Sequence, residues 1–378
     1  MKISFVTTYD AGDVHNWSGL SYYLSKTLKG QQAELEYIGN LHLRHRNVLR
    51  IKKMLYNKAF RRKYLMEREP MVAESYAMQV AKRISPTSHC VFCPGSVPIA
   101  RLETSRPKVF YTDATFAGML GFYDSFSNLC AETIRHGNQL EQDALSSCAL
   151  AIYSSDWAAR TAIQHYRVDP GKVKVVPFGA NMECSRSYED ISRIVEMRSQ
   201  KVCKLLFLGV EWDRKGGALA VEVADAMNRS GQSTELHIAG IRDLPLSPLP
   251  DFIRNYGFIS KSTQEGRDRI SQLMTDCHFL ILPTRAEAYG LVFCEANSFG
   301  MPAIATKVGG IPTIIKDGEN GRLFSLADPA AAYATYIAGL FNNYPVYREM
   351  ALSSFHEFRT RLNWEVSGKK IMQLLEDL

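Results

Sequence analysis

The amino-acid sequence predicts an α/β protein made of two doubly wound domains, each a parallel sheet covered by helices. Three observations support this prediction. Short apolar segments bounded by turn residues alternate with amphipathic segments along most of the chain, as in repeated strand–helix units. The chain has 378 residues, which is more than one ordinary hydrophobic core accommodates. A second strand–helix series begins after VVPFGAN, residues 175–181.

The first series of elements ends near Phe178. Its strands are predicted at 3–9, 34–40, 89–95, 108–113, 149–155 and 172–179. Its helices are predicted at 19–30, in the basic segment 42–69, and at 70–84 and 128–148. The apolar core of the first segment is too short for a secretory signal, so we expect a strand there.

The second series repeats the same alternation. Its strands are predicted at 204–211, 235–240, 278–284 and 302–310, with one short strand inside 251–260. Its helices are predicted at 215–231, 265–277 and 290–300, and from Asp328 to the last residue. The turn-rich stretch 317–324 is expected to form a hairpin-like structure.

Composition narrows the functional classes. No apolar run approaches the roughly 18 residues of a membrane span. The eight cysteines show no disulfide framework, so we expect a reduced, cytoplasmic protein. The net charge of +6 comes from one segment, because residues 42–69 hold ten Lys or Arg against two Glu and the rest of the chain is −2. This distribution does not indicate nucleic-acid binding.

The stretch RAEAYGLVFCEANSFGMP, residues 285–302, places two glutamates eight positions apart. Glu287 follows the predicted strand 278–284, and ligands of open α/β sheets bind at that end of a strand. Gly290 begins the next helix, whose first amides lack intrahelical acceptors and attract anions. Glu295 lies inside this helix. Two carboxylates beside free amides suit a nucleotide sugar. The alternative is that Glu287 is a solvated loop residue and that Glu295 lies on an exposed helix face.

Four motifs in order resemble the retaining glycosyltransferases of family 4. They are FLG at 207–209, RKGG at 214–217, ILPTRAEAYGLVFCEANSFGMPAIAT at 281–306 and VGGIP at 308–312. The E-x7-E of Glu287 and Glu295 is that family's signature. The resemblance implies the GT-B fold, in which two Rossmann-like domains face each other across a cleft and a last helix crosses back to the first domain. It implies an acceptor-side domain of residues 1–179 plus about 359–378, and a nucleotide-sugar domain of residues 180–358.

The resemblance also implies roles at the donor site. Glu287 would contact the hydroxyls of the donor hexose, and Glu295 would accept from the ribose hydroxyls. The backbone amides between them would face the sugar and the diphosphate; they belong to Tyr289, Gly290, Leu291 and Val292.

Arg214 and Lys215 are expected to open the helix at RKGG. Cations are electrostatically unfavourable at a helix N-terminus, and a bound dianion would explain them. In the family a lysine here stabilises the departing diphosphate. The family often has Arg directly after the FLG glycine, where this chain has Val210, and Arg214 would replace that charge.

Two further candidates lie in the first series. Gly19 follows the first strand and begins a helix, where the family uses glycine so that backbone approaches the diphosphate or acceptor. Asp113 follows the strand 108–113, at a position where many members place a histidine. It would orient a sugar hydroxyl, accept the acceptor's proton or cap the following turn, and the sequence does not choose among these.

The implied reaction moves a hexose from a nucleoside-diphosphate sugar to an acceptor hydroxyl with retained anomeric configuration. The acceptor would be a saccharide, a lipid-linked glycan or another glycoconjugate, and no metal or other cofactor would be needed. Two alternatives stay open: a nucleotide-sugar epimerase of the same fold, and a non-catalytic partner that binds a sugar nucleotide.

The basic segment 42–69 has a second interpretation. Val48, Ile51, Leu55 and Ala59 follow helical spacing among many cations. Such a helix would bind an anionic membrane or an anionic acceptor. The alternative is a surface helix whose charges are simply solvated.

Overall fold

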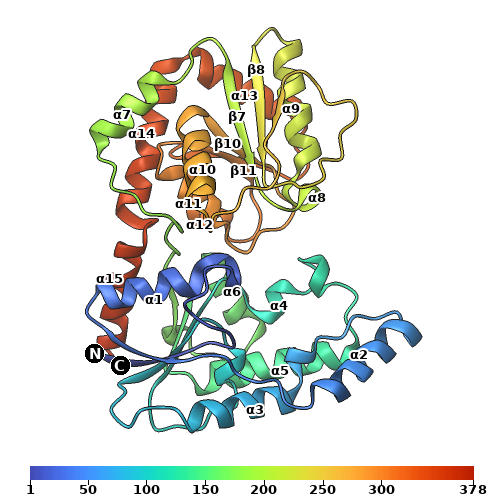
Figure 1. Ribbon diagram of the computed structural model, residues 1–378, viewed down its shortest axis with the longest axis vertical. Coiled ribbons are helices and arrows are strands. Elements are labelled where there is room, and N and C mark those ends of the chain that lie inside the picture. Colours follow the sequence, from blue (N-terminus) through green and yellow to red (C-terminus); the bar gives the residue numbers. More distant parts are fainter. The chain divides into compact units, whose positions relative to one another are not determined.

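The computed structural model describes all 378 residues. The chain folds into two compact units, one of Met1–Pro177 with Trp364–Leu378 and the other of Phe178–Asn363 (Figure 1). Each unit contains a six-stranded sheet in which every neighbouring pair of strands is parallel. The prediction of two doubly wound α/β domains is therefore confirmed.

The sheet of the first unit has the strand order β2-β1-β3-β4-β5-β6. Its strands are β1 (Lys2–Val6), β2 (Glu34–Ile38), β3 (Cys90–Cys93), β4 (Lys108–Thr112), β5 (Leu150–Tyr153) and β6 (Val173–Val175). Its α-helices are α1 (Leu20–Gly30), α2 (Arg46–Ala59), α3 (Pro70–Ala81), α4 (Phe116–Met119), α5 (Ala131–Ser147), α6 (Asp156–His165) and α15 (Trp364–Glu376). The residues of β3, β4 and β5 are all buried, as expected for central parallel strands with helices on both faces.

The sheet of the second unit has the strand order β12-β11-β10-β7-β8-β9. Its strands are β7 (Cys203–Leu208), β8 (Thr234–Ala239), β9 (Ile253–Asn255), β10 (Phe279–Leu282), β11 (Ala303–Thr306) and β12 (Gly321–Phe324). Its helices are α7 (Tyr188–Met197), α8 (Trp212–Lys215), α9 (Gly217–Arg229), α10 (Gln264–Asp276), α11 (Leu291–Asn297), α12 (Ile311–Ile314), α13 (Ala330–Asn342) and α14 (Tyr344–Arg361). In chain order this is the 3-2-1-4-5-6 arrangement of dinucleotide-binding folds.

The C-terminal helical region is divided into two helices where the sequence predicts one helix over about 359–378. The chain leaves α14 at Leu362, and the side chain of Asn363 donates to the carbonyl of Phe358 at 2.7 Å. The second helix, α15, packs against α1 of the first unit (Figure 1). A Cβ at Gly368 would lie 2.4 Å from Cγ2 of Thr27, so glycine permits this close approach.

The prediction of a hairpin-like structure at 317–324 is wrong. The residues Gly321–Phe324 form the edge strand β12, which runs parallel to β11. The turn residues were correctly recognised, but the turn joins α12 to a strand rather than one strand to another. Asp317 stabilises it, because its carboxylate accepts the amide of Leu323 at 2.8 Å.

The basic segment 42–69 is helical only in part. Residues Arg46–Ala59 form α2, and the chain leaves the helix after it and makes an isolated parallel bridge between Lys63 and Leu129. A short 3-10 turn, Met66–Arg68, precedes α3. No helix of the structure is long and apolar enough to cross a membrane.

Candidate nucleotide-sugar site

The candidate site lies where the strand order of the second sheet reverses. The first strand of this unit, β7, has β8 on one side and β10 on the other. Ligands of open α/β sheets bind beyond the carboxyl ends of the strands at such a switch point. The loops that follow β7 and β10 carry Lys215 and Glu287, so the sheet topology brings these two residues together.

The loop after β7 contains the short helix α8, which ends at Lys215. Arg214 and Lys215 therefore close one helix rather than open the next, which corrects the sequence interpretation. Gly216 separates α8 from α9 with a φ of +77°. A Cβ at this position would lie 2.1 Å from the carbonyl oxygen of Pro283. Glycine thus lets the loop after β7 press against the loop after β10.

These two loops are joined by hydrogen bonds around Arg214. Its carbonyl accepts from the amide of Arg285 and from the hydroxyl of Thr284, both at 2.8 Å. Its guanidinium donates to the carbonyl of Ala286 at 2.7 Å. The carboxylate of Glu211 pairs with the same guanidinium from a half-exposed position. The cationic side chains therefore lie on a rigid support at the switch point.

Glu287 is the shared partner of both cations. The ammonium of Lys215 forms an ion pair with Oε2 of Glu287, and Nη1 of Arg214 lies 3.3 Å from the same oxygen. Lys215 is 8% exposed and Glu287 is 9% exposed. A buried charge is tolerated when it is paired, so the ion pair explains how both side chains are accommodated below the surface. The alternative of a solvated Glu287 is wrong.

The helix α11 begins directly after this cluster. Its N-cap is Gly290, which has a φ of +95°. The amides of the first turn, which includes Leu291 and Val292, have no acceptor within the helix. The side chain of Tyr289 is buried and donates to the carbonyl of Phe178 at 2.8 Å, so its hydroxyl already has a partner.

Glu295 has its own cation. Its carboxylate is on the first turns of α11 and is 1% exposed, so the alternative of an exposed helix face is also wrong. The ammonium of Lys261 lies 2.6 Å from each carboxylate oxygen. Lys261 comes from the loop between β9 and α10, and its side chain is 49% exposed. The exposed side chain of Lys261 thus pairs with a carboxylate that is itself shielded from solvent.

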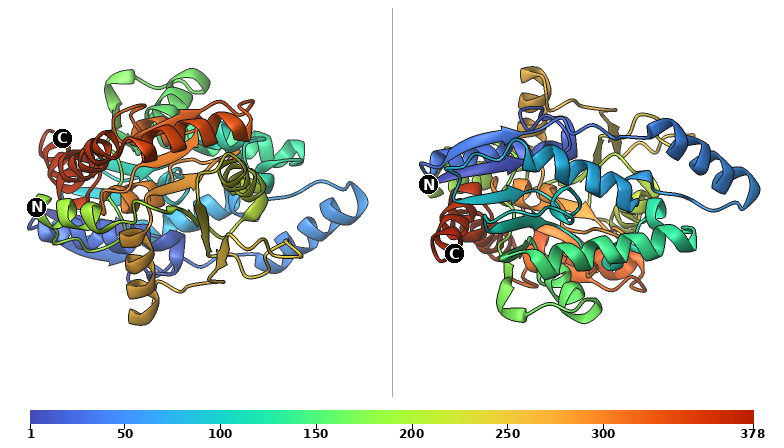
Figure 2. Two further views of the ribbon diagram at one scale, coloured as in Figure 1. Left: turned by 90° about the horizontal axis from the view of Figure 1, so that it is seen from above. Right: turned by 90° about the horizontal axis from the view of Figure 1, so that it is seen from below.

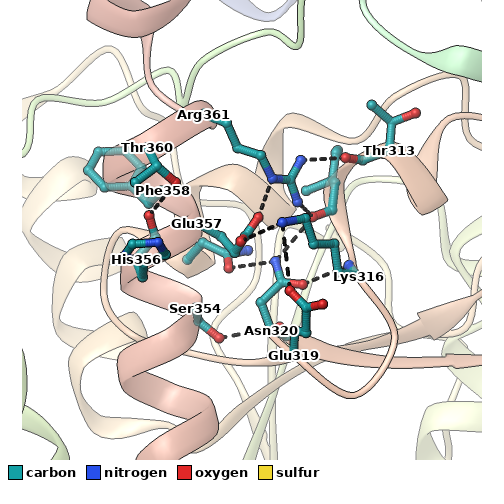
Figure 3. Close-up of polar contacts among 12 residues, drawn as sticks. Thr313, Lys316, Glu319, Asn320, Ser354, His356, Glu357, Phe358, Thr360 and Arg361 are labelled. Atoms are coloured by element: carbon teal, nitrogen blue, oxygen red, sulfur yellow. Dashed lines mark hydrogen bonds and ion pairs between the residues drawn. The ribbon is translucent and has the colours of Figure 1, made fainter.

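A polar network holds α11 from its C-terminal end. The side chain of Asn320 donates to Oδ1 of Asn297 at 3.0 Å and to the carbonyl of Ile314 at 3.1 Å. Figure 3 shows this network beside α14, where Glu357 accepts from Lys316 at 2.8 Å and from Arg361. Arg361 and Lys316 hold the pKa of the Glu357 carboxyl below its usual value, against the opposing effect of burial. The helix that carries Glu295 therefore has a fixed position.

The remaining two candidates lie in the first unit. Gly19 is the N-cap of α1 with a φ of +80°, and it follows two further residues in left-handed conformations, Trp17 and Ser18. Asp113 stands directly after β4 and is half-buried. The following helix α4 is capped by Thr115, whose hydroxyl accepts the amide of Gly118 at 3.0 Å. Both candidates lie at the carboxyl edge of the first sheet.

Sequence reasoning did not select Lys261. The segment 251–260 was correctly expected to contain a short strand, and a lysine shortly after a strand lies at the same sheet edge as the two glutamates. The position of Lys261 after this strand is the one sequence feature that could have indicated its place near the site. The pairing with Glu295 spans 34 residues and depends on the strand order, which the local pattern does not contain.

Comparison with known proteins finds similarity to glycosyltransferases. Residues 203–343 match the family model described as glycosyl transferases group 1. The D-inositol 3-phosphate glycosyltransferase of Acidothermus cellulolyticus is 26% identical over 250 residues, which are 63% of this chain and 55% of that protein. The chain spans about half the length of several of the curated relatives it matches.

Solved structures share the fold of the whole chain. The sucrose-phosphate synthase of Thermosynechococcus elongatus superimposes with a TM-score of 0.70 at 15% identity, over 100% of this chain and 98% of that one. HepE of Anabaena, solved in complex with UDP, superimposes with a TM-score of 0.67 at 16% identity, over 100% of both chains. The chain therefore has the fold of these GT-B glycosyltransferases.

Proposed function

We propose that the protein is a retaining glycosyltransferase that moves a hexose from a nucleoside-diphosphate sugar to an acceptor hydroxyl. The observation that carries this proposal is the pair of buried carboxylates, Glu287 and Glu295, on either side of the first turn of α11 at a topological switch point. The matched family model and the names of the relatives support the same class of reaction.

In this proposal the cations stabilise the diphosphate. Lys215 and Arg214 lie against Glu287 beside the N-terminus of α11, and a diphosphate there would share their charge. Negative charge grows on the diphosphate as the bond to the sugar breaks. Preorganised cations in a largely buried position stabilise that change strongly, and they need no metal ion to do so. The scheme requires the donor and the acceptor and no further cofactor.

The two carboxylates would bind hydroxyls. A carboxylate only accepts hydrogen bonds, and sugar and ribose hydroxyls donate them. Glu287 would accept from the hexose and Glu295 from the ribose, with the amides of Tyr289 to Val292 between them facing the sugar and the diphosphate. Lys215 and Lys261 neutralise these carboxylates in the free protein, so hydroxyl donors would join or replace the ammonium groups.

The proposed chemistry is attack on the same face of the sugar. The bond between the anomeric carbon and the phosphate oxygen breaks, and a bond from that carbon to the acceptor oxygen forms. The acceptor's proton moves to the departing phosphate oxygen. The first unit would bind a carbohydrate or lipid-linked acceptor, with Gly19 supplying backbone and Asp113 orienting a hydroxyl.

The test is a donor screen. Purified protein is incubated with UDP-, GDP- and ADP-linked hexoses, and free nucleoside diphosphate is measured with and without candidate acceptors, in buffer containing EDTA. We expect acceptor-dependent release from one donor, and nuclear magnetic resonance should show the donor's anomeric configuration in the product. A new sugar nucleotide formed without an acceptor would indicate an epimerase. Tight donor binding without any turnover would indicate a non-catalytic partner.

A further inference from the structure

The helix α2 exposes an apolar stripe. Val48 is 61% exposed, Ile51 is 64% exposed and Leu55 is 55% exposed. Their spacing places them on one side of the helix together with Ala59. Isolated exposed apolar residues are common on protein surfaces, whereas several large ones aligned on one helix face mark a contact surface. Both views of Figure 2 show α2 extending away from the sheet of its unit.

Different residues attach α2 to its unit. Leu49 is the only buried residue of the helix. The ammonium of Lys52 lies 2.9 Å from Glu69 and 2.8 Å from Glu132, and the hydroxyl of Tyr56 donates to Glu132 at 3.0 Å. None of these contacts involves the apolar stripe. The stripe is therefore not needed to hold the helix in place.

The exposed polar face of α2 is cationic. Arg46, Arg50 and Lys53 follow helical spacing on a side of the helix away from the stripe, all three are exposed, and none forms an ion pair. The chain contains no Asp or Glu from His42 to Met66. Elsewhere in the basic segment, Lys63 pairs with Asp124 at 2.9 Å. Neighbouring acids neutralise Lys63 and Lys52, and three of the four unpaired cations of α2 lie on this face, the fourth being Lys58.

We propose that α2 is a docking site for an anionic lipid bilayer. The helix would lie in the plane of the interface, with Val48, Ile51 and Leu55 at the boundary of the acyl chains. The cations of the polar face would be attracted by the negative surface potential. A largely apolar face opposite a Lys- and Arg-rich face is the pattern of interfacial helices.

Charge distinguishes this occupant from a second copy of the chain. Self-association through α2 would bring two cationic helices together with no acidic residue from 42 to 66 to compensate them, and such like-charge contact is unfavourable. An anionic bilayer compensates the charge and covers the stripe at the same time. The surface that fits both features is therefore lipid.

Vesicle sedimentation tests this proposal without donor or acceptor. The full chain is mixed with vesicles of phosphatidylcholine alone or with phosphatidylglycerol added. We expect binding only to the anionic vesicles, decreasing as salt rises from about 0.05 to 0.5 M. The combined Arg46→Ser, Arg50→Ser, Lys53→Ser variant should bind about 100-fold more weakly, from about 1 kcal/mol per charge near the surface. The Val48→Ser, Ile51→Ser, Leu55→Ser variant should lose at least about 10-fold.

Matched controls remove equivalent groups elsewhere. Lys82→Ser, Lys201→Ser and Lys370→Ser together remove three exposed charges, and Leu326→Ser removes an exposed apolar side chain. Both controls should bind like the wild-type protein, and circular dichroism should show all variants folded. Absence of wild-type binding at low salt, or equal losses in the controls, would overturn the proposal. A wild-type dimer that the stripe variant converts to a monomer would overturn it in favour of a second copy.

Discussion

Replacing the two buried glutamates by glutamine, one at a time, should separate binding of the nucleotide from transfer of the sugar. Glutamine keeps the size of the side chain and removes its charge. At Glu295 the change would weaken two proposed hydrogen bonds from ribose hydroxyls, by about 1 kcal/mol each. Free nucleoside diphosphate should then bind about 30-fold more weakly. The ammonium of Lys261 would lose its partner, but its side chain is 49% exposed and water solvates it, so stability should change little.

At Glu287 the same substitution should act in the opposite direction on nucleotide binding. It would leave Lys215, which is 8% exposed, without its carboxylate and with Arg214 close by. The unliganded protein should lose roughly 1–3 kcal/mol of stability, the usual cost of an unpaired buried group. A bound diphosphate would then supply the missing negative charge, so free nucleotide should bind equally well or up to about 10-fold more tightly. Transfer from the whole donor should fall because the hexose loses its acceptor.

Isothermal titration calorimetry decides this prediction. The nucleoside diphosphate released in the donor screen is titrated into wild-type protein and into the Glu287→Gln and Glu295→Gln variants. Glu222→Gln, on the exposed surface of α9, serves as the control and should bind like the wild type. Equal loss of affinity in both site variants would refute the separate roles. So would tighter binding by the Glu295→Gln variant.

Three further outcomes are expected. Lys215→Met should lower turnover by about 100-fold or more while Lys201→Met leaves it unchanged, and near-normal turnover in the folded variant would contradict the role of Lys215. Gly216→Ala should destabilise the second unit, because its Cβ would overlap the carbonyl of Pro283, and an unchanged urea midpoint would be inconsistent with that contact. Burial lowers the pKa of His278 to about 3, and its neutral ring accepts the amide of Lys204 at 3.0 Å. The unfolded chain therefore binds a proton that the folded chain does not, and stability falls by about 1.4 kcal/mol per unit as pH drops from about 6.5 towards 3. In urea titrations His278→Gln should reduce that pH dependence, and an unchanged slope would argue against it.

Much of the fold followed from local patterns. The apolar runs that form β1, β4 and β10 are bounded by turn residues. Because these strands are buried on both faces, their sequences are continuous apolar runs that local inspection recognises as buried strands. The start of α11 at Gly290 also followed from the sequence, because a glycine between a strand and an apolar helical pattern marks a helix boundary. These features depend on neighbours within a few residues.

The features that the sequence did not provide depend on distant neighbours. Glu287 and Glu295 pair with Lys215 and Lys261, which lie 72 and 34 residues earlier in the chain. Position at the carboxyl edge of a strand is a local property, but which edge residues meet depends on strand order. The parallel direction of β12 could not be predicted for the same reason. A turn of this composition can join two strands or a helix and a strand, and the local sequence does not distinguish these cases.

The ion pairs explain how a site for an anionic ligand with many hydroxyls persists when it is empty. A buried carboxylate without a cation would gain a proton or destabilise the fold, and a buried ammonium without an anion would lose its proton or destabilise the fold. Lys215 and Glu287 satisfy each other, as do Lys261 and Glu295. Under the proposed function, donor binding is then an exchange of partners in which hydroxyls donate to the carboxylates and phosphate oxygens accept from Lys215 and Arg214. Such an exchange leaves each of these charged groups hydrogen-bonded in either state, so the same four charged side chains that stabilise the second unit can also bind the donor.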